Sequence, residues 1–123
     1  MSALTAIKVG MQVTQRLADI HQNRITHLDV KPRNLTVGLG NDSNVINLID
    51  FGVSEFFLNE SRRHIVERRV DQSIGTYRFM SINSHGQMQL SRRDDIESMA
   101  YLLIHICRPG GLPWGLRASP NKI

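Results

Sequence analysis

Apolar side chains recur at helical spacing in two stretches of the chain, and these stretches predict its main helices. Over residues 4–22 the apolar positions lie three and four residues apart, as in an amphipathic helix. Residues 92–107 repeat this spacing and carry further apolar side chains on another face, so we expect that helix to be buried. Ser91, three residues before Asp94, is typical of a helix N-terminus, and Pro109 with the glycines after it ends the helix. The repeating positions are Ala6, Val9, Val13, Leu17 and Ile20 in the first stretch, and Ile96, Met99, Ala100, Leu103, Ile104 and Cys107 in the second.

The region between the two helices is patterned for short strands and loops. Residues 35–37 and 45–49 are strand candidates that flank the turn-forming residues 38–44, so we expect a β-hairpin. Residues 50–83 lose periodicity and are rich in charge, which predicts a long functional loop. The expected fold is therefore mainly α-helical, with short β-hairpins and one long loop.

Length and composition restrict the class of protein. A chain of 123 residues is one domain or a piece of one, and 41% hydrophobic residues is ordinary for a globular protein. The single Cys107 excludes an internal disulfide. The first ten residues lack the pattern of a signal peptide, and the longest apolar stretch, 99–104, is too short to cross a bilayer. We therefore expect an intracellular protein, cytoplasmic or nuclear, that is neither secreted nor bound to a membrane.

Arginine is concentrated in one part of the sequence. The net charge is +4, and seven arginines fall between Glu60 and Asp94, an interval whose acidic residues are Glu67 and Asp71. Such a region attracts phosphate, acidic peptides or nucleic acid, and the plain alternative is a solvated basic loop. Nucleic acid is the least favoured partner, because no aromatic residues interleave with the arginines for base stacking. The seven are Arg62, Arg63, Arg68, Arg69, Arg78, Arg92 and Arg93.

Three short motifs follow one another in an order that indicates phosphoryl transfer. Residues 27–34 read H-L-D-V-K-P-R-N, which matches the catalytic-loop pattern H-x-D-x-x-x-x-N of phosphotransferases. Asp50-Phe51-Gly52 is the triplet that supplies a magnesium ligand, and Gly75-Thr76-Tyr77-Arg78 follows it. Each motif is common alone, whereas the ordered set, with a hairpin between the first two, is specific.

The residue types in these motifs fit the chemistry of phosphoryl transfer. Asp29 is the candidate that accepts or orients the proton of a substrate hydroxyl, and Lys31 can place a cation beside the transferring group. Asn34 and Asp50 supply hard oxygen ligands that suit Mg²⁺, and the hairpin would bring these two residues together. An isolated Asp or Asn in a loop is usually a turn former, so the interpretation depends on the whole set.

Two further residues are expected to support this site. Thr76 could hydrogen-bond Asp29 and Lys31 across the site, although Gly75-Thr76 alone would be read as a turn. Asp95, at the start of the second helix, could accept backbone N–H groups from the catalytic loop. The alternative for Asp95 is a carboxylate that the helix dipole favours whatever its partners.

Together these motifs resemble a eukaryotic protein kinase, and further residues narrow the resemblance to the casein kinase I family. Ser81-Ile82-Asn83 stands where most kinases carry Ala-Pro-Glu, and residues 91–98 follow as S-R-R-D-D-I-E-S, with Leu112-Pro113-Trp114 later. The similarity runs over residues 4–118 and implies that residues 1–123 are part of a protein kinase domain, from its C-lobe. The implied parts are the helix 4–22 before the catalytic loop, the catalytic loop 27–34, the activation segment 50–83 and the buried helix 92–107.

The resemblance also implies cofactors, partners and the roles of single residues. The cofactors would be ATP and Mg²⁺, and the reaction would transfer the γ-phosphate to Ser or Thr of protein substrates near acidic or already phosphorylated residues. Arg78, Gly110 and Arg117 match the pocket that holds such substrate anions in the family, and an arginine fork suits phosphate. The other implied roles are Asp29 as catalytic base, Lys31 as phosphate contact, Asn34 and Asp50 as magnesium ligands, Thr76 as a further catalytic residue, and His27 and Asp95 as structural support.

Two functional interpretations follow from the resemblance. The first is a serine/threonine protein kinase of casein kinase I type, and it is favoured because Asp29, Asn34 and Asp50 are all present. The second is a catalytically inactive kinase-like remnant, or a module that binds acidic or phosphorylated partners through its arginines. Leu28, at a position where kinases carry Arg, favours the second.

The residues that grip ATP from the first lobe of a kinase are not found in the sequence. Lys8 lies in a segment that resembles the lysine-bearing strand of kinases, but it is too close to Asp29 for the intervening elements, and Gly38-Leu39-Gly40 reads as a hairpin turn. We therefore expect the 123-residue chain by itself to aggregate or to lack ATP-dependent turnover.

Overall fold

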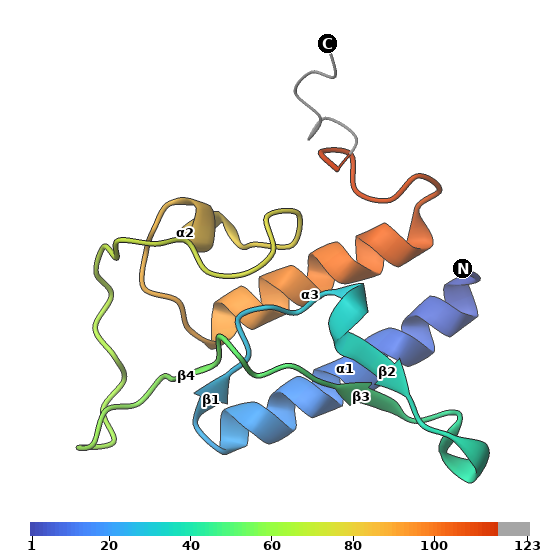
Figure 1. The fold of residues 1–123 in the computed structure, drawn as a ribbon, viewed down its shortest axis with the longest axis horizontal. Coiled ribbons are helices and arrows are strands. Elements are labelled where there is room, and N and C mark those ends of the chain that lie inside the picture. The colour runs from blue at the N-terminus through green and yellow to red at the C-terminus, as the bar shows by residue number, and fades with distance from the viewer. Residues whose placement is uncertain (116–123) are drawn as a thin grey trace.

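Two long helices form the frame of the molecule, and the shorter elements lie against them (Figure 1). The structure is a computed structural model and describes residues 1–115. The helices are α1 (Ala3–Gln22), α2 (Ile82–His85) and α3 (Arg92–Cys107), with two 3-10 turns, η1 (Pro32–Asn34) and η2 (Gly40–Asp42). The strands are β1 (Ile25–Thr26), β2 (Leu35–Val37), β3 (Ile46–Leu48) and β4 (Glu55–Phe56). They form two antiparallel pairs, β1 with β4 and β2 with β3.

Helix α1 covers the range expected from the spacing of its apolar residues. It begins after Ser2, whose hydroxyl oxygen accepts a hydrogen bond from the backbone N–H of Thr5 at 3.2 Å. This contact satisfies one of the N–H groups that the first turn of a helix leaves without an internal partner. Val13 and Leu17 on its inner face are fully buried and meet Val30 and Leu102, which together form the centre of the core.

The hairpin β2–β3 brings the chain back beside Asn34, the last residue of the catalytic-loop motif. Leu35 lies opposite Leu48 in the register, and the N–H of Ile49 donates to the carbonyl of Asn34 at 2.9 Å. Gly38 is required in the turn, because a Cβ there would lie 2.4 Å from the backbone oxygen of Asp42. The expected hairpin is present, and its base brings Asn34 next to the residue before Asp50.

Residues 50–83, expected as one long loop, contain more regular structure than their sequence indicates. Strand β4 pairs with β1, and the N–H of Phe57 continues that pairing by donating to the carbonyl of Arg24 at 3.1 Å. Helix α2 begins at the end of the segment, capped by the Ser81 side chain, which accepts from the N–H of Ser84 at 3.1 Å. Elements this short hold too few residues for a period to emerge in the sequence. Backbone hydrogen bonds to the distant β1 define β4, whereas local bonds such as that from His85 N–H to the Ser81 carbonyl define α2.

Helix α3 is less buried than its apolar content suggests, and part of its inner face is polar. Ile96 and Ile104 are 43% and 45% exposed. The residues that α3 does bury are Asp94, Asp95, Ser98 and Leu102, and the three polar ones hydrogen-bond to loops. Helical spacing of apolar residues could not indicate this, because the face that meets the loops is made of hydrogen-bonding side chains. Within residues 1–115, no helix combines the length and apolar character needed to cross a bilayer.

Candidate active site

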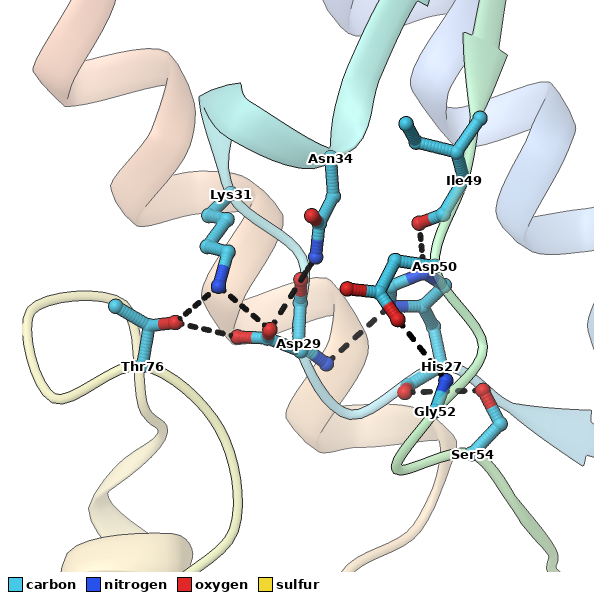
Figure 2. Close-up of polar contacts among 9 residues, drawn as sticks. All are labelled: His27, Asp29, Lys31, Asn34, Ile49, Asp50, Gly52, Ser54 and Thr76. Carbon is cyan, nitrogen blue, oxygen red and sulfur yellow. Dashed lines mark hydrogen bonds and ion pairs between the residues drawn. The ribbon is translucent and has the colours of Figure 1, made fainter.

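The carboxylate of Asp29 is the centre of a hydrogen-bonded network (Figure 2). Lys31 Nζ donates to Asp29 Oδ2 at 2.7 Å, and the hydroxyl of Thr76 donates to Asp29 Oδ1 at 2.7 Å. Lys31 Nζ also lies 2.6 Å from Thr76 Oγ1, so these three side chains close a ring. The structure thus brings together residues from the catalytic-loop motif and from a motif more than forty positions later.

Asn34 joins this network through its amide nitrogen, and its side-chain oxygen accepts no hydrogen bond within residues 1–115. Asn34 Nδ2 donates to the backbone oxygen of Asp29 at 2.8 Å and to Asp29 Oδ2 at 3.2 Å. Asp50 follows the hairpin base at Asn34, adopts a positive φ of 65°, and accepts from the N–H of Gly52 at 3.2 Å. In the view of Figure 2 its carboxylate points toward Asn34 and Asp29.

Asn34 and Asp50 are the residues of this site that could hold a magnesium ion together with phosphate oxygens and water. Both residues offer hard oxygen donors, the class that magnesium prefers. In the described part of the chain, no group of three His, Cys, Asp or Glu side chains could hold a metal ion by itself.

Asp29 is held as a carboxylate by its neighbours. Burial is the largest single influence and would raise its pKa, but the hydrogen bonds from Lys31 and Thr76, the charge of Lys31 and the Asn34 amide together lower the pKa below its ordinary value of 3.8. The side chain is 14% exposed, so these contacts act with limited screening by water. Asp29 is therefore ionised at neutral pH and presents acceptor oxygens only.

Asp95, fully buried on α3, fixes the backbone that leads into Asp29. Its Oδ2 accepts from the N–H of His27 at 2.9 Å, and its Oδ1 accepts from the N–H of Leu28 at 2.7 Å. Leu28 has a positive φ of 66°, an uncommon conformation for a leucine, which allows two successive N–H groups to face one carboxylate. The Asp95 contacts therefore hold a strained turn directly before Asp29.

His27 connects the catalytic-loop motif with the segment around Asp50. Its Nδ1 accepts from the N–H of Asp29 at 3.2 Å, so Nε2 carries the proton and donates to the carbonyl of Ile49 at 3.0 Å. The ring also packs edge-on against Phe51, with centroids 5.0 Å apart. The buried imidazole of His27 therefore contacts Asp29 and both neighbours of Asp50 in the chain, Ile49 and Phe51.

The segment that carries Thr76 is fastened to α3 by several contacts. Ser98 donates to the carbonyl of Phe79 at 2.6 Å, and Glu97 Oε1 accepts from the N–H of Ile82 at 2.8 Å. Glu97 also accepts from the hydroxyl of Tyr101 at 2.7 Å. This hydrogen bond, followed by burial and the charge of Glu97, raises the pKa of Tyr101 to about 12. Helix α3 thus positions both sides of the site, Thr76 through its middle turns and Asp29 through Asp95.

The residues expected to bind a substrate anion are described only in part. The N–H of the Trp114 indole donates to the carbonyl of Arg78 at 2.9 Å, and a Cβ at Gly115 would lie 3.5 Å from Arg78 Nε. Exposed Arg78 therefore lies against the loop that follows α3, which includes Gly110 with its φ of 82°. Arg117 lies outside the described residues.

His21 is a site residue that the sequence analysis missed. Its Nε2 lies 2.8 Å from Asp95 Oδ2 and completes the set of partners around that carboxylate. The available signal was its spacing: His21 follows the buried Leu17 by four residues, so it lies on the inner face of α1. Ser54, which donates to the carbonyl of His27 at 3.2 Å, had no comparable signal.

Two comparisons with known proteins bear on this site. The family model of the protein kinase domain matches residues 1–117. The casein kinase I homolog RAG8 of Kluyveromyces lactis is 36% identical over 126 aligned residues, which cover 99% of this chain and 23% of that protein. The chain thus spans less than a quarter of the length of this relative.

Proposed function

Because this chain belongs to the protein kinase domain family, as the resemblance in its motifs indicated, we propose that it carries the phosphoryl-transfer centre of a serine/threonine kinase of casein kinase I type. The observation that carries this proposal is the ring formed by Asp29, Lys31 and Thr76, joined by Asn34. In this proposal residues 1–123 belong to the C-lobe, with residues 27–34 as catalytic loop and 50–83 as activation segment.

The proposed reaction transfers the γ-phosphate of ATP to a serine or threonine hydroxyl. The hydroxyl oxygen forms the new bond to phosphorus, the bond from phosphorus to the β-phosphate oxygen breaks, and the hydroxyl proton passes to the Asp29 carboxylate. Because the pKa of Asp29 is lowered, this carboxylate orients the hydroxyl and takes its proton late, rather than removing the proton beforehand. Lys31 provides a positive charge at the same place.

Asn34 and Asp50 would hold magnesium, which when bound neutralises charge on the phosphate oxygens. The free Oδ1 of Asn34 and the Asp50 carboxylate are the proposed ligands. His27 and Asp95 would keep Asp29 in place. The proposed substrates are proteins whose target residue lies near acidic or phosphorylated side chains, with Arg78, Gly110 and Arg117 as the anion contacts.

A chimera tests this function, since the chain spans only part of its relative. Residues 1–123 would replace the aligned segment of the Kluyveromyces lactis homolog, and transfer of labelled phosphate from ATP to an acidic serine peptide would be measured. We expect turnover that falls by about a hundredfold or more with either variant, since Asp29→Asn removes the proposed base and Asp50→Ala removes a proposed magnesium ligand. Asp42→Asn is the matched control, because this exposed carboxylate in the hairpin turn makes no side-chain hydrogen bond within residues 1–115.

The control outcomes separate the two interpretations of the sequence. A folded chimera without turnover would favour the inactive binding module, for which Leu28 is the supporting observation: it is buried and holds a strained backbone where kinases carry Arg. Turnover that survives Asp29→Asn would contradict the assignment of that residue.

A further inference from the structure

A pocket of about 310 Å³ opens between the segment that follows Thr76 and the second half of α3, and the proposed reaction does not use it. Four of its six lining residues carry aromatic rings, and these rings come from four separate parts of the chain. The volume is at the low end of the range for ligand sites, so it suits a single side chain. We call it the ring pocket, and its lining residues are Tyr77, Met80, Ile82, His85, Tyr101 and Trp114.

The four rings of the ring pocket form two pairs, and within each pair the ring planes are nearly perpendicular. Tyr101 and Trp114 have centroids 5.2 Å apart and planes at 79°. Tyr77 and His85 have centroids 4.8 Å apart and planes at 83°. The Trp114 indole is held in place because its N–H donates to the carbonyl of Arg78 at 2.9 Å. Tyr77 is 66% exposed and Trp114 is 41% exposed, so a ligand can reach these rings.

A carboxylate lies directly behind the wall of the ring pocket. Glu97 Oε1 accepts from the hydroxyl of Tyr101 at 2.7 Å and from the N–H of Ile82 at 2.8 Å, and both of these residues line the pocket. Because the pKa of Tyr101 is raised to about 12, its hydroxyl keeps its proton at neutral pH and the negative charge stays on Glu97. Within residues 1–115, Glu97 forms no ion pair with a Lys, Arg or His side chain. The pocket therefore combines aromatic rings with a negative charge, which favours a cation as its ligand.

The hydrogen-bonding groups around the ring pocket restrict which cation fits it. The Trp114 N–H and the Tyr101 hydroxyl donate to protein acceptors, and Glu97 Oε1 already accepts two hydrogen bonds. A lysine ammonium brings three donors and an arginine guanidinium brings five, and a buried donor without an acceptor is costly. A trimethylammonium group carries the same charge and has no N–H to satisfy, and aromatic cages recognise methylated ammonium groups of this kind.

We propose that the ring pocket binds a trimethylated lysine side chain of a partner protein, at a place separate from the Asp29 network. The rings attract the cation through their π faces, and the charge of Glu97 adds to this attraction. Although Arg78 adjoins Tyr77 in the chain, it is not among the lining residues, and the lining holds no lysine or arginine. Since Tyr77 follows Thr76, which donates to Asp29, a partner held in the ring pocket lies beside the proposed site of transfer without taking part in its chemistry.

Binding of a fluorescein-labelled peptide to the full chain, followed by fluorescence polarisation, tests this proposal. The peptide consists of glycine and serine around one trimethyllysine, and a matched neutral peptide carries a carbon atom in place of the ammonium nitrogen. We expect the charged peptide to bind about fivefold more tightly than the neutral one, and more tightly than a peptide with unmethylated lysine. The fluorescence of Trp114, the single tryptophan of the chain, should change when the unlabelled charged peptide binds, because its ring lines the pocket.

Variants of the full chain separate the contribution of the charge from that of the rings. Glu97→Gln keeps an oxygen for the N–H of Ile82 and should lower the affinity for the charged peptide about threefold, with no change for the neutral one. Tyr77→Leu removes an exposed ring and should also lower the affinity for the charged peptide about threefold. Glu60→Gln changes an exposed carboxylate outside the pocket, and Asp29→Asn removes the proposed catalytic base; both should leave the affinity unchanged.

Three results would overturn the proposal. Equal affinities for the charged and the neutral peptide would show an apolar site without a preference for a cation. Tighter binding of the lysine peptide, or of an arginine peptide, would overturn the choice of a methylated side chain. An unchanged Trp114 signal while the labelled peptide binds would place the binding elsewhere on the chain. Each of these measurements uses the unaltered chain and is independent of phosphoryl transfer, so its outcome stands whether or not the proposed kinase function does.

Discussion

Replacing Asp95 by Asn should destabilise the chain far more than the loss of one exposed charge. The Asp95 carboxylate is fully buried and accepts from two backbone N–H groups, those of His27 at 2.9 Å and Leu28 at 2.7 Å, and contacts His21 at 2.8 Å. Asn offers one oxygen and one NH₂ group in the same space. One backbone N–H would then face another donor.

The size of the effect follows from these contacts. A hydrogen bond to a charged group contributes about 1.5–3 kcal/mol, and a buried donor without a partner costs about 1–3 kcal/mol. Since the amide oxygen of Asn still satisfies one of the two N–H groups, we expect a loss of about 2–4 kcal/mol. This is a large part of the total stability of a domain, which is about 5–15 kcal/mol.

Urea unfolding of the full chain, followed by far-ultraviolet circular dichroism, measures this loss. Asp71→Asn is the matched control, because Asp71 is exposed and makes no side-chain hydrogen bond in the described part of the chain; its effect should stay within about 0.5 kcal/mol. A loss below about 1 kcal/mol for Asp95→Asn would refute the reasoning, since it would mean that the Leu28 turn does not depend on the carboxylate.

Two further predictions concern the site and the hairpin. The carboxyl of Asp29 should titrate below 3.8 by NMR, because Lys31, Thr76 and Asn34 hold it ionised, and Lys31→Met should raise this pKa. The stability that ionised Asp29 contributes to the fold is then present above pH 3.8 and is lost as the pH falls through the lower pKa of the folded state. A midpoint at or above 3.8 in the original chain would contradict this prediction. Gly38→Ala should lower the free energy of unfolding in urea by about 2 kcal/mol or more, since its Cβ would lie 2.4 Å from the backbone oxygen of Asp42. Gly40→Ala is the control, because Gly40 has a φ of 58° and open space around it, and it should lower the free energy of unfolding by about 1 kcal/mol. Equal losses for the two variants would show that the turn relaxes around Gly38.

The long helices and the β2–β3 hairpin were predictable because they follow local rules. The spacing of residues such as Val13 and Leu17 sets the inner face of α1, and turn formers around Gly38 set the hairpin. Strand β4 and the 57–65 hairpin were not predicted. The pairing of β4 joins residues far apart, such as Phe57 and Arg24, and a side-chain period can reveal neither a two-residue strand nor the single bridge between Leu58 and His64.

The candidate site was predicted from motif order rather than from packing. The motifs predicted that Thr76 hydrogen-bonds Asp29 and Lys31, and the structure supplies the geometry of the ring that these three side chains form. The place of His21 was not foreseen, because its partner Asp95 lies 74 residues away. Arg62 was counted among the basic residues, but its positive φ could not be inferred from the sequence.

The hydrogen bond from Ile49 to Asn34 makes the tip of the hairpin between them a place where the length of the chain can change. Both residues lie at its base, so a change in the length of the tip, around residues 40–44, leaves the base contacts as they are. The entropy of closing a loop rises only slowly with its length, and exposed tips are the places where insertions are best tolerated. Natural variation in length, or an engineered tag, therefore has a site here that leaves Asn34 and Asp50 at the same separation.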